Sequence, residues 1–131
     1  MKTIVFACVH NAGRSQMAAA WFNHLAKLRA EPRIALSAGT SPAERVHPEV
    51  VDVMKEVGID LSAARPQKLT PELLKNAQLL VTMGCGDECP YLPGLQTEDW
   101  PLEDPKGQAT ERVREIRDEI RRRVEDMLQR D

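Results

Sequence analysis

An apolar run, a short loop with a thiol and an arginine, and an amphipathic stretch follow one another at the start of this chain. Residues 3–7 predict a buried strand, and residues 14–30 predict a helix with apolar side chains at spacings of three and four. The loop between them begins at Cys8 and ends in Gly13, Arg14 and Ser15. A strand, loop and helix in this order are typical of α/β folds, in which ligands bind at the carboxyl ends of strands.

The chemistry of this loop is that of an anion site with a nucleophile. Backbone N–H groups of such a loop and of the helix start can converge on one oxyanion, and the planar Arg14 guanidinium can bind two of its oxygens. The same field favours the thiolate of Cys8, and the Ser15 hydroxyl can stabilise its charge. The plainer alternative is a buried cysteine that ends a strand and a solvated arginine. We predict that the anion site consists of Val9, His10, Asn11, Ala12, Gly13, Arg14 and Ser15.

Strands and helices alternate along the rest of the chain, which predicts right-handed crossovers and a parallel sheet covered on both faces. The helix over 14–30 is expected to bury Met17, Trp21, Leu25 and Leu28. Proline- and glycine-rich residues 84–108 are expected to form a long irregular segment. The other expected elements are a strand over 33–39, a helix from Pro48, a short helix from Pro71, a strand over 78–83 and a helix over about 110–129.

Size and composition restrict the class of protein further. A chain of 131 residues predicts one domain, 1–131, and a net charge of −2 gives no reason to expect a nucleic-acid or membrane partner. No apolar run reaches membrane-spanning length, and Met1 leads directly into a strand rather than a signal peptide, so we expect a cytoplasmic protein. We also expect a monomer. Three cysteines in that compartment favour reactive thiols over structural disulfides.

Two of these thiols, Cys85 and Cys89, are four residues apart in a glycine-containing segment. Cysteines at this spacing can reach disulfide geometry, which predicts a redox pair. The alternatives are two inert thiols or half of a zinc site. Zinc needs four ligands, and no second Cys/His pair stands at a suitable spacing, so we predict no metal.

Asp104 is followed by Pro105 in the same irregular segment and is a candidate proton donor. An aspartate fixed by a following proline on an exposed loop can protonate a leaving oxygen. Asp-Pro is also a common turn, so the pair alone is weak evidence.

Taken together, these motifs resemble those of the arsenate reductases built on the low-molecular-weight protein tyrosine phosphatase fold. The resemblance covers nearly the whole chain and rests on Cys8 to Ala18, Ser37 to Thr40, Val81 to Met83, Cys85 with Cys89, and Asp104-Pro105. It implies a three-layer α/β/α fold with a four-stranded parallel sheet. It also implies reduction of arsenate to arsenite by successive thiol attacks.

The resemblance assigns a role to each site residue. Cys8 would attack arsenic, Arg14 and the loop amides would hold its oxygens, and Asp104 would protonate the departing hydroxyl. Asn11 would brace the loop through side-chain hydrogen bonds, and Ser15 would stabilise the thiolate. Two further residues would complete the relay: Cys85 would attack the adduct, and Cys89 would take over the disulfide.

The resemblance implies no tightly bound cofactor, only an external thiol reductant. Thioredoxin is favoured; a low-molecular-weight thiol with a glutaredoxin-like protein is the alternative. Some family members hold a potassium ion near the loop with an acidic residue on the first helix, but Ala18, Ala19 and Ala20 occupy that stretch here, so no such site is expected.

A protein tyrosine phosphatase is the main competing function, with the same Cys8, Arg14 and Asp104 and water as the final nucleophile. A phosphatase has no need for Cys85 and Cys89, and it needs an aromatic wall for phosphotyrosine, whereas aromatic residues are 4% of this chain. A non-catalytic anion-binding or metal-sensing module would keep the loop without requiring Asp104.

Overall fold

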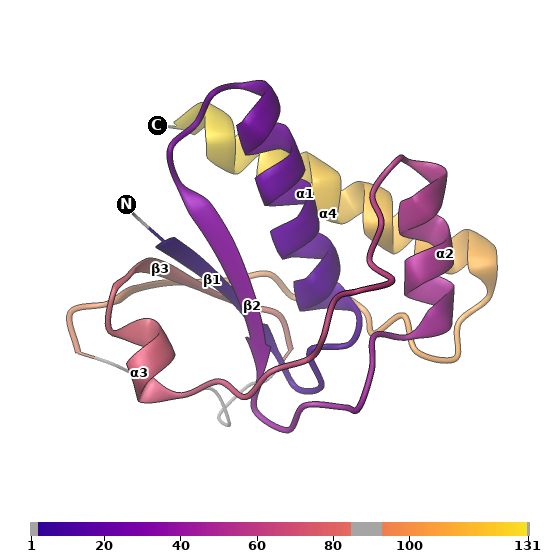
Figure 1. Ribbon diagram of the computed structural model, residues 1–131, viewed down its shortest axis with the longest axis horizontal. Coiled ribbons are helices and arrows are strands. Elements are labelled where there is room, and N and C mark those ends of the chain that lie inside the picture. Colours follow the sequence, from indigo (N-terminus) through magenta and orange to yellow (C-terminus); the bar gives the residue numbers. More distant parts are fainter. Residues whose placement is uncertain (1–2, 85–92, 131) are drawn as a thin grey trace.

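A four-stranded parallel sheet organises the computed structural model, which describes residues 3–84 and 93–130 (Figure 1). The strand order is β2-β1-β3-β4, and every neighbouring pair is parallel. The predicted fold class is therefore confirmed. The strands are β1 (Thr3–Cys8), β2 (Ile34–Gly39), β3 (Ala77–Thr82) and β4 (Gln96–Asp99), and the helices are α1 (Arg14–Leu28), α2 (Pro48–Glu56), α3 (Pro71–Leu74) and α4 (Thr110–Arg130).

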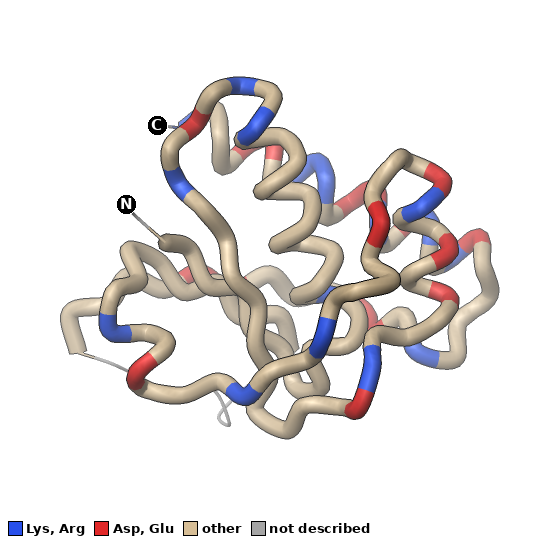
Figure 2. The backbone as a smooth tube through the Cα atoms, in the orientation of Figure 1, with Lys and Arg blue, Asp and Glu red and all other residues tan. Residues whose placement is uncertain are grey.

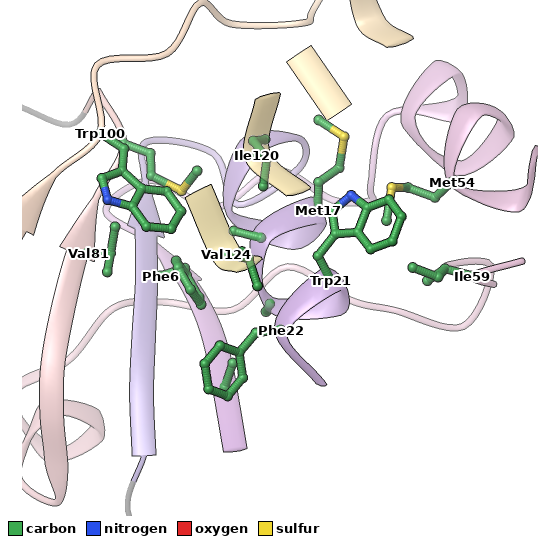
Figure 3. Close-up of a cluster of buried hydrophobic side chains, with 14 of the residues drawn as sticks. Phe6, Met17, Trp21, Phe22, Met54, Ile59, Val81, Trp100, Ile120 and Val124 are labelled. Carbon is green, nitrogen blue, oxygen red and sulfur yellow. The ribbon is translucent and has the colours of Figure 1, made fainter. Parts of the chain in front are cut away.

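The sheet separates a large core from a small one. On the face that α1, α2 and α4 cover, Phe6 lies between Phe22 and Trp100, with ring centroids 6.3 and 5.5 Å away (Figures 1 and 3). Burying an aromatic side chain of this size stabilises the fold by about 1.5–3 kcal/mol. The opposite face carries a smaller cluster, which includes Val5 and Leu74 and lies against α3.

β1 is one of the two inner strands, and its side chains alternate between the two cores. Ile4, Phe6 and Cys8 belong to the large cluster, whereas Val5 and Ala7 belong to the small one. The Cys8 side chain therefore lies on the face that α1 covers. The chain moves from β1 to β2 on one side and later to β3 on the other, which makes the carboxyl end of β1 a topological switch point.

α4 closes the large core along its length. The residues that its apolar spacing places inward are all buried: Val113, Ile116, Ile120, Val124 and Leu128. Its charged residues of both signs are interspersed along the helix (Figure 2). No helix in the described ranges is long and apolar enough to cross a membrane.

The structure corrects three details of the sequence interpretation. The sequence predicts an irregular segment over 84–108, but this segment contains β4. β4 is a short edge strand with little burial, so its residues Gln, Thr, Glu and Asp can all be polar. α1 ends at Leu28 rather than at residue 30, and the Leu28 side chain is 72% exposed instead of buried. Ala30 has a φ of 53°, a left-handed conformation in which the right-handed helix α1 cannot continue.

Candidate active site

The loop from Cys8 to Gly13 is held from outside by the segment that follows β2. The carbonyl oxygens of Cys8, Val9, His10 and Ala12 accept hydrogen bonds from the backbone N–H groups of residues 40, 41, 43 and 47, at 2.8–3.2 Å. In a trans peptide group, the N–H of the following residue points in the opposite direction to the carbonyl oxygen. The N–H groups of the loop are therefore turned away from that segment, which leaves them free to face an anion.

The start of α1 continues this row of donors. Gly13 is the N-cap and makes no side-chain capping bond, and no acidic residue stands in the first turn. The first N–H groups of a helix have no partner within it, and the helix dipole places partial positive charge there. An oxyanion can therefore occupy the position of a capping side chain.

Asn11 bends the loop and fixes its interior. Its φ of 51° is left-handed, a conformation that asparagine tolerates better than most residues. The buried Asn11 side chain donates from Nδ2 to Ser15 Oγ at 2.8 Å, and its Oδ1 accepts from the backbone N–H of Gln67 at 2.9 Å. The loop is thus attached to α1 on one side and to the segment before α3 on the other.

Cys8 and Ser15 face each other inside this loop. Cys8 Sγ lies 2.8 Å from Ser15 Oγ, and both residues are buried. A hydroxyl at this distance can stabilise negative charge on sulfur, whereas a thiol surrounded by apolar groups alone stays protonated.

Arg14 is held by the segment that precedes α4. Its Nη1 donates to the Leu102 carbonyl oxygen at 2.9 Å, and its Nη2 lies 3.9 Å from Asp104 Oδ2. Gly84, with φ of 92°, packs against the guanidinium so closely that any side chain there would overlap Nη1. The guanidinium therefore has little freedom, which suits bidentate recognition of an anion.

Asp104 reaches the loop through the residue that follows it. Pro105 is buried against Gly13, and a Cβ at position 13 would lie 2.8 Å from Pro105 Cγ. The Asp104 side chain is 45% exposed, and its Oδ1 accepts from the backbone N–H of Lys106 at 3.0 Å. Its other oxygen is the one that points towards Arg14.

The structure thus brings together five of the residues singled out from the sequence: Cys8, Asn11, Arg14, Ser15 and Asp104. His10 is exposed, and its Nδ1 lies 3.2 Å from the Ser41 carbonyl oxygen, on the outside of the loop. Cys85 and Cys89 lie outside the described residues. Among the residues that are described, no three His, Cys, Asp or Glu side chains are grouped to hold a metal ion.

Sequence reasoning missed three contacts of the site. The Leu102 carbonyl and the backbone N–H of Gln67 are backbone groups, which leave no signal in the identity of a side chain. Gln16 is different, because a polar residue on the inward side of α1 next to Met17 is a recognisable exception to helical patterning. That exception was available in the sequence.

A thiol beside backbone donors and an arginine, with a carboxyl group opposite, defines a class of enzymes that attack tetrahedral oxyanions with sulfur. The model of the family "Low molecular weight phosphotyrosine protein phosphatase" matches residues 3–130. This chain belongs to that family.

Known relatives within the family include arsenate reductases. A curated protein of Halobacterium salinarum is 44% identical over 125 residues, which cover 94% of this chain and 88% of that protein. An arsenate reductase of Staphylococcus aureus is 36% identical over 133 residues, covering 98% of each. The structure of a thioredoxin-dependent arsenate reductase of Corynebacterium glutamicum superposes with a TM-score of 0.83 at 37% identity; the match covers 98% of this chain but 61% of that one.

Proposed function

We propose that this protein reduces arsenate to arsenite, with Cys8 as the nucleophile. The observation that carries the proposal is the Cys8 sulfur, which lies 2.8 Å from a hydroxyl in a loop where four carbonyl groups bond to the segment after β2. Relatives at 36% identity over nearly the whole chain are named arsenate reductases, which favours this substrate over other oxyanions.

The first step is attack of sulfur on arsenic. The loop N–H groups and Arg14 bind the oxygens of the tetrahedral anion, and the Cys8 thiolate forms a sulfur–arsenic bond. An arsenic–oxygen bond breaks, and the Asp104 carboxyl group supplies the proton with which the oxygen leaves as water. The 3.9 Å separation of Asp104 from Arg14 supports this role, because an acid there lies beside the bound oxygens.

The second step moves two electrons to arsenic. Cys85 attacks the Cys8 sulfur, a disulfide forms, and the electron pair of the broken sulfur–arsenic bond stays on arsenic, which leaves as arsenite. Cys89 then attacks the Cys85 sulfur and releases the Cys8 thiolate. Two thiols are oxidised for each arsenate reduced. The likeness to arsenate reductases, together with the four-residue spacing of the pair, supports these two roles.

An external dithiol returns the Cys85–Cys89 disulfide to thiols. A thiol reductant of the thioredoxin type is proposed, since the Corynebacterium glutamicum relative is thioredoxin-dependent. A low-molecular-weight thiol acting directly on the arsenic adduct, followed by a glutaredoxin-like protein, is the competing route. A cytoplasmic location belongs to the proposal, because the cycle starts from reduced thiols.

Phosphatase activity is the competing function for the same loop. The described aromatic side chains, Phe6, Trp21, Phe22 and Trp100, are all buried in the core, and the fifth aromatic residue of the chain, Tyr91, lies outside the described residues. No described aromatic ring is therefore available to hold a phosphotyrosine ring beside Cys8.

The test compares the two activities in one preparation. Arsenate-dependent oxidation of a thioredoxin system is measured beside hydrolysis of an aryl phosphate, with Cys8→Ser as the control. We expect arsenate turnover that Cys8→Ser abolishes. Aryl phosphate hydrolysis without arsenate turnover would assign the protein to the phosphatases instead.

A further inference from the structure

Gln16 is a buried amide that no catalytic step uses. It is the third residue of α1, is 6% exposed, and turns its Nε2 towards the loop rather than to solvent. This nitrogen lies 3.1 Å from the Asn11 carbonyl oxygen, 3.2 Å from Asn11 Oδ1 and 3.3 Å from the Arg65 carbonyl oxygen. All three partners can only accept, so the NH₂ group of Gln16 must face them.

The orientation of the Asn11 amide follows from its donors. Asn11 Oδ1 faces Gln16 Nε2 and the backbone N–H of Gln67, and both of these groups can only donate. An oxygen must therefore occupy that position, which directs the Asn11 NH₂ group to Ser15 Oγ, 2.8 Å away. A flipped amide would place donor against donor on one side and leave Ser15 without this donor on the other.

The direction of this bond decides what the Ser15 hydroxyl does. Because Ser15 Oγ accepts from Asn11, its single proton remains to be donated, and Cys8 Sγ lies 2.8 Å from it. A hydroxyl that donates stabilises a thiolate, whereas one that accepts from the sulfur stabilises the thiol. The series of bonds from Gln16 through Asn11 and Ser15 therefore ends on the sulfur with a consistent polarity.

We propose that Gln16 is a positioning residue that locks the Asn11 amide, so that Ser15 donates to the Cys8 sulfur and favours its thiolate. The inference rests on the proposed function in one respect, the role of Cys8 as nucleophile. The contact of Gln16 Nε2 with the Arg65 carbonyl oxygen also attaches the segment before α3 to the loop, which keeps the Gln67 N–H in place.

The test follows the reactivity of Cys8 without arsenate. Alkylation by iodoacetamide is timed by mass spectrometry of the Cys8 peptide in the full-length reduced protein and in Gln16→Met, which keeps the length of the side chain but has no donor. Loss of one such hydrogen bond predicts alkylation slower by about 2- to 10-fold near neutral pH. The difference should vanish in strongly alkaline solution, where thiols ionise without help.

Asn23→Ala is the matched control on the same helix. Asn23 makes two hydrogen bonds to the Ala35 backbone, at 2.8 and 3.0 Å. Ala35 stands near the start of β2, whereas Cys8 pairs with Gly39 at its end. Asn23→Ala therefore removes part-buried hydrogen bonds of α1 away from the Cys8 loop. It should reduce stability and leave Cys8 alkylation at the wild-type rate. Equal slowing in Asn23→Ala, or slowing in Gln16→Met that persists at high pH, would make Gln16 a structural residue only.

A second variant covers the case in which Gln16→Met does not fold. Gln16→Leu is of similar size and uncharged and cannot donate to Asn11 or Arg65, so the same slowing is expected. A wild-type rate of alkylation in whichever variant folds would overturn the proposal. Because this readout needs no arsenate, failure of the reductase proposal would appear in turnover alone and not in alkylation.

Discussion

Gly13 and Pro105 pack so closely that a methyl group at position 13 would lie 2.8 Å from Pro105 Cγ. The loop that holds Cys8 and the segment that carries Asp104 are thus in direct contact, although they are far apart in the sequence. The absence of a side chain at Gly13 is what lets the proposed acid approach the proposed nucleophile.

Gly13→Ala is therefore expected to damage catalysis more than folding. Pro105 must move, and Asp104 moves with it, so the first chemical step should slow by about 10²-fold, as for a misplacement near 1 Å. The measurement is single-turnover formation of the arsenic adduct. Gly58→Ala is the control, because Gly58 has φ of 84° and open space around it, so alanine costs stability there without touching the site. Unchanged adduct formation in Gly13→Ala would show that the contact does not position the acid.

Asp104→Asn tests the acid itself. An amide keeps the oxygen that accepts from the Lys106 N–H, so the turn should persist, but it has no proton to give. General acids contribute about 10²–10⁴-fold, and we expect single-turnover adduct formation to slow by that factor.

The matched control for Asp104→Asn is Asp99→Asn. The Asp99 carboxylate accepts from Thr82 Oγ1 at 2.8 Å, at the end of β4, and its loss should leave the chemical step unchanged. An effect in Asp99→Asn and none in Asp104→Asn would transfer the role to Asp99.

Arg14→Lys separates charge from geometry. A lysine keeps the positive charge but loses the fork that donates both to the Leu102 carbonyl and towards the anion. Removing one preorganised donor to a developing oxyanion costs about 10²–10³-fold in kcat, and we expect a loss of that size. Arg122→Lys, on the exposed face of α4 with Glu119 as its partner, is the control and should be neutral. Wild-type kcat in Arg14→Lys would show that charge alone suffices.

Acid stability should depend on Glu56, which joins α2 to α4. Hydrogen bonds from Arg114 and, to a smaller extent, from Arg117 lower the pKa of Glu56 from 4.5 to about 2. Because the folded pKa lies below the unfolded one, Glu56 stabilises the fold fully above about pH 4.5, and this contribution is lost as the pH falls towards 2.

Unfolding in denaturant at pH 2 to 7 checks this dependence on the pKa of Glu56. Glu56→Gln should be less stable than wild type at neutral pH and should approach it at the acid end. Glu115→Gln should follow the wild-type profile, since its partner Arg112 retains Glu103. A constant gap between Glu56→Gln and wild type at all pH values would contradict the linkage.

The sequence was sufficient for the parts of the fold that depend on apolar periodicity. β1 and α4 follow their patterns closely because both bury nearly every apolar residue. β4 could not be found this way, since an edge strand of Gln, Thr, Glu and Asp has no buried face to impose alternation. The prediction for Leu28 was wrong for a different reason: Leu28 follows the helical spacing, but it is the last residue of α1 and its side chain is exposed.

The site was predictable in its reactive side chains and not in its supports. Cys8 and Arg14 could be identified because thiols and guanidinium groups have chemistry of their own. The positive φ of Asn11 and the bond from Arg14 to the Leu102 carbonyl depend on long-range backbone placement. Such contacts are set by tertiary packing, which no local pattern encodes.

Reduction of one equivalent of arsenate by the fully reduced protein alone tests the central claim most directly. Arsenite is quantified, free thiols are counted, and the mass of the protein is measured by mass spectrometry, with Cys8→Ser as the control. We expect about one equivalent of arsenite, two fewer thiols and one disulfide in the wild type, and none of these in Cys8→Ser. Arsenite released with all three thiols intact, or release by Cys8→Ser, would contradict the account.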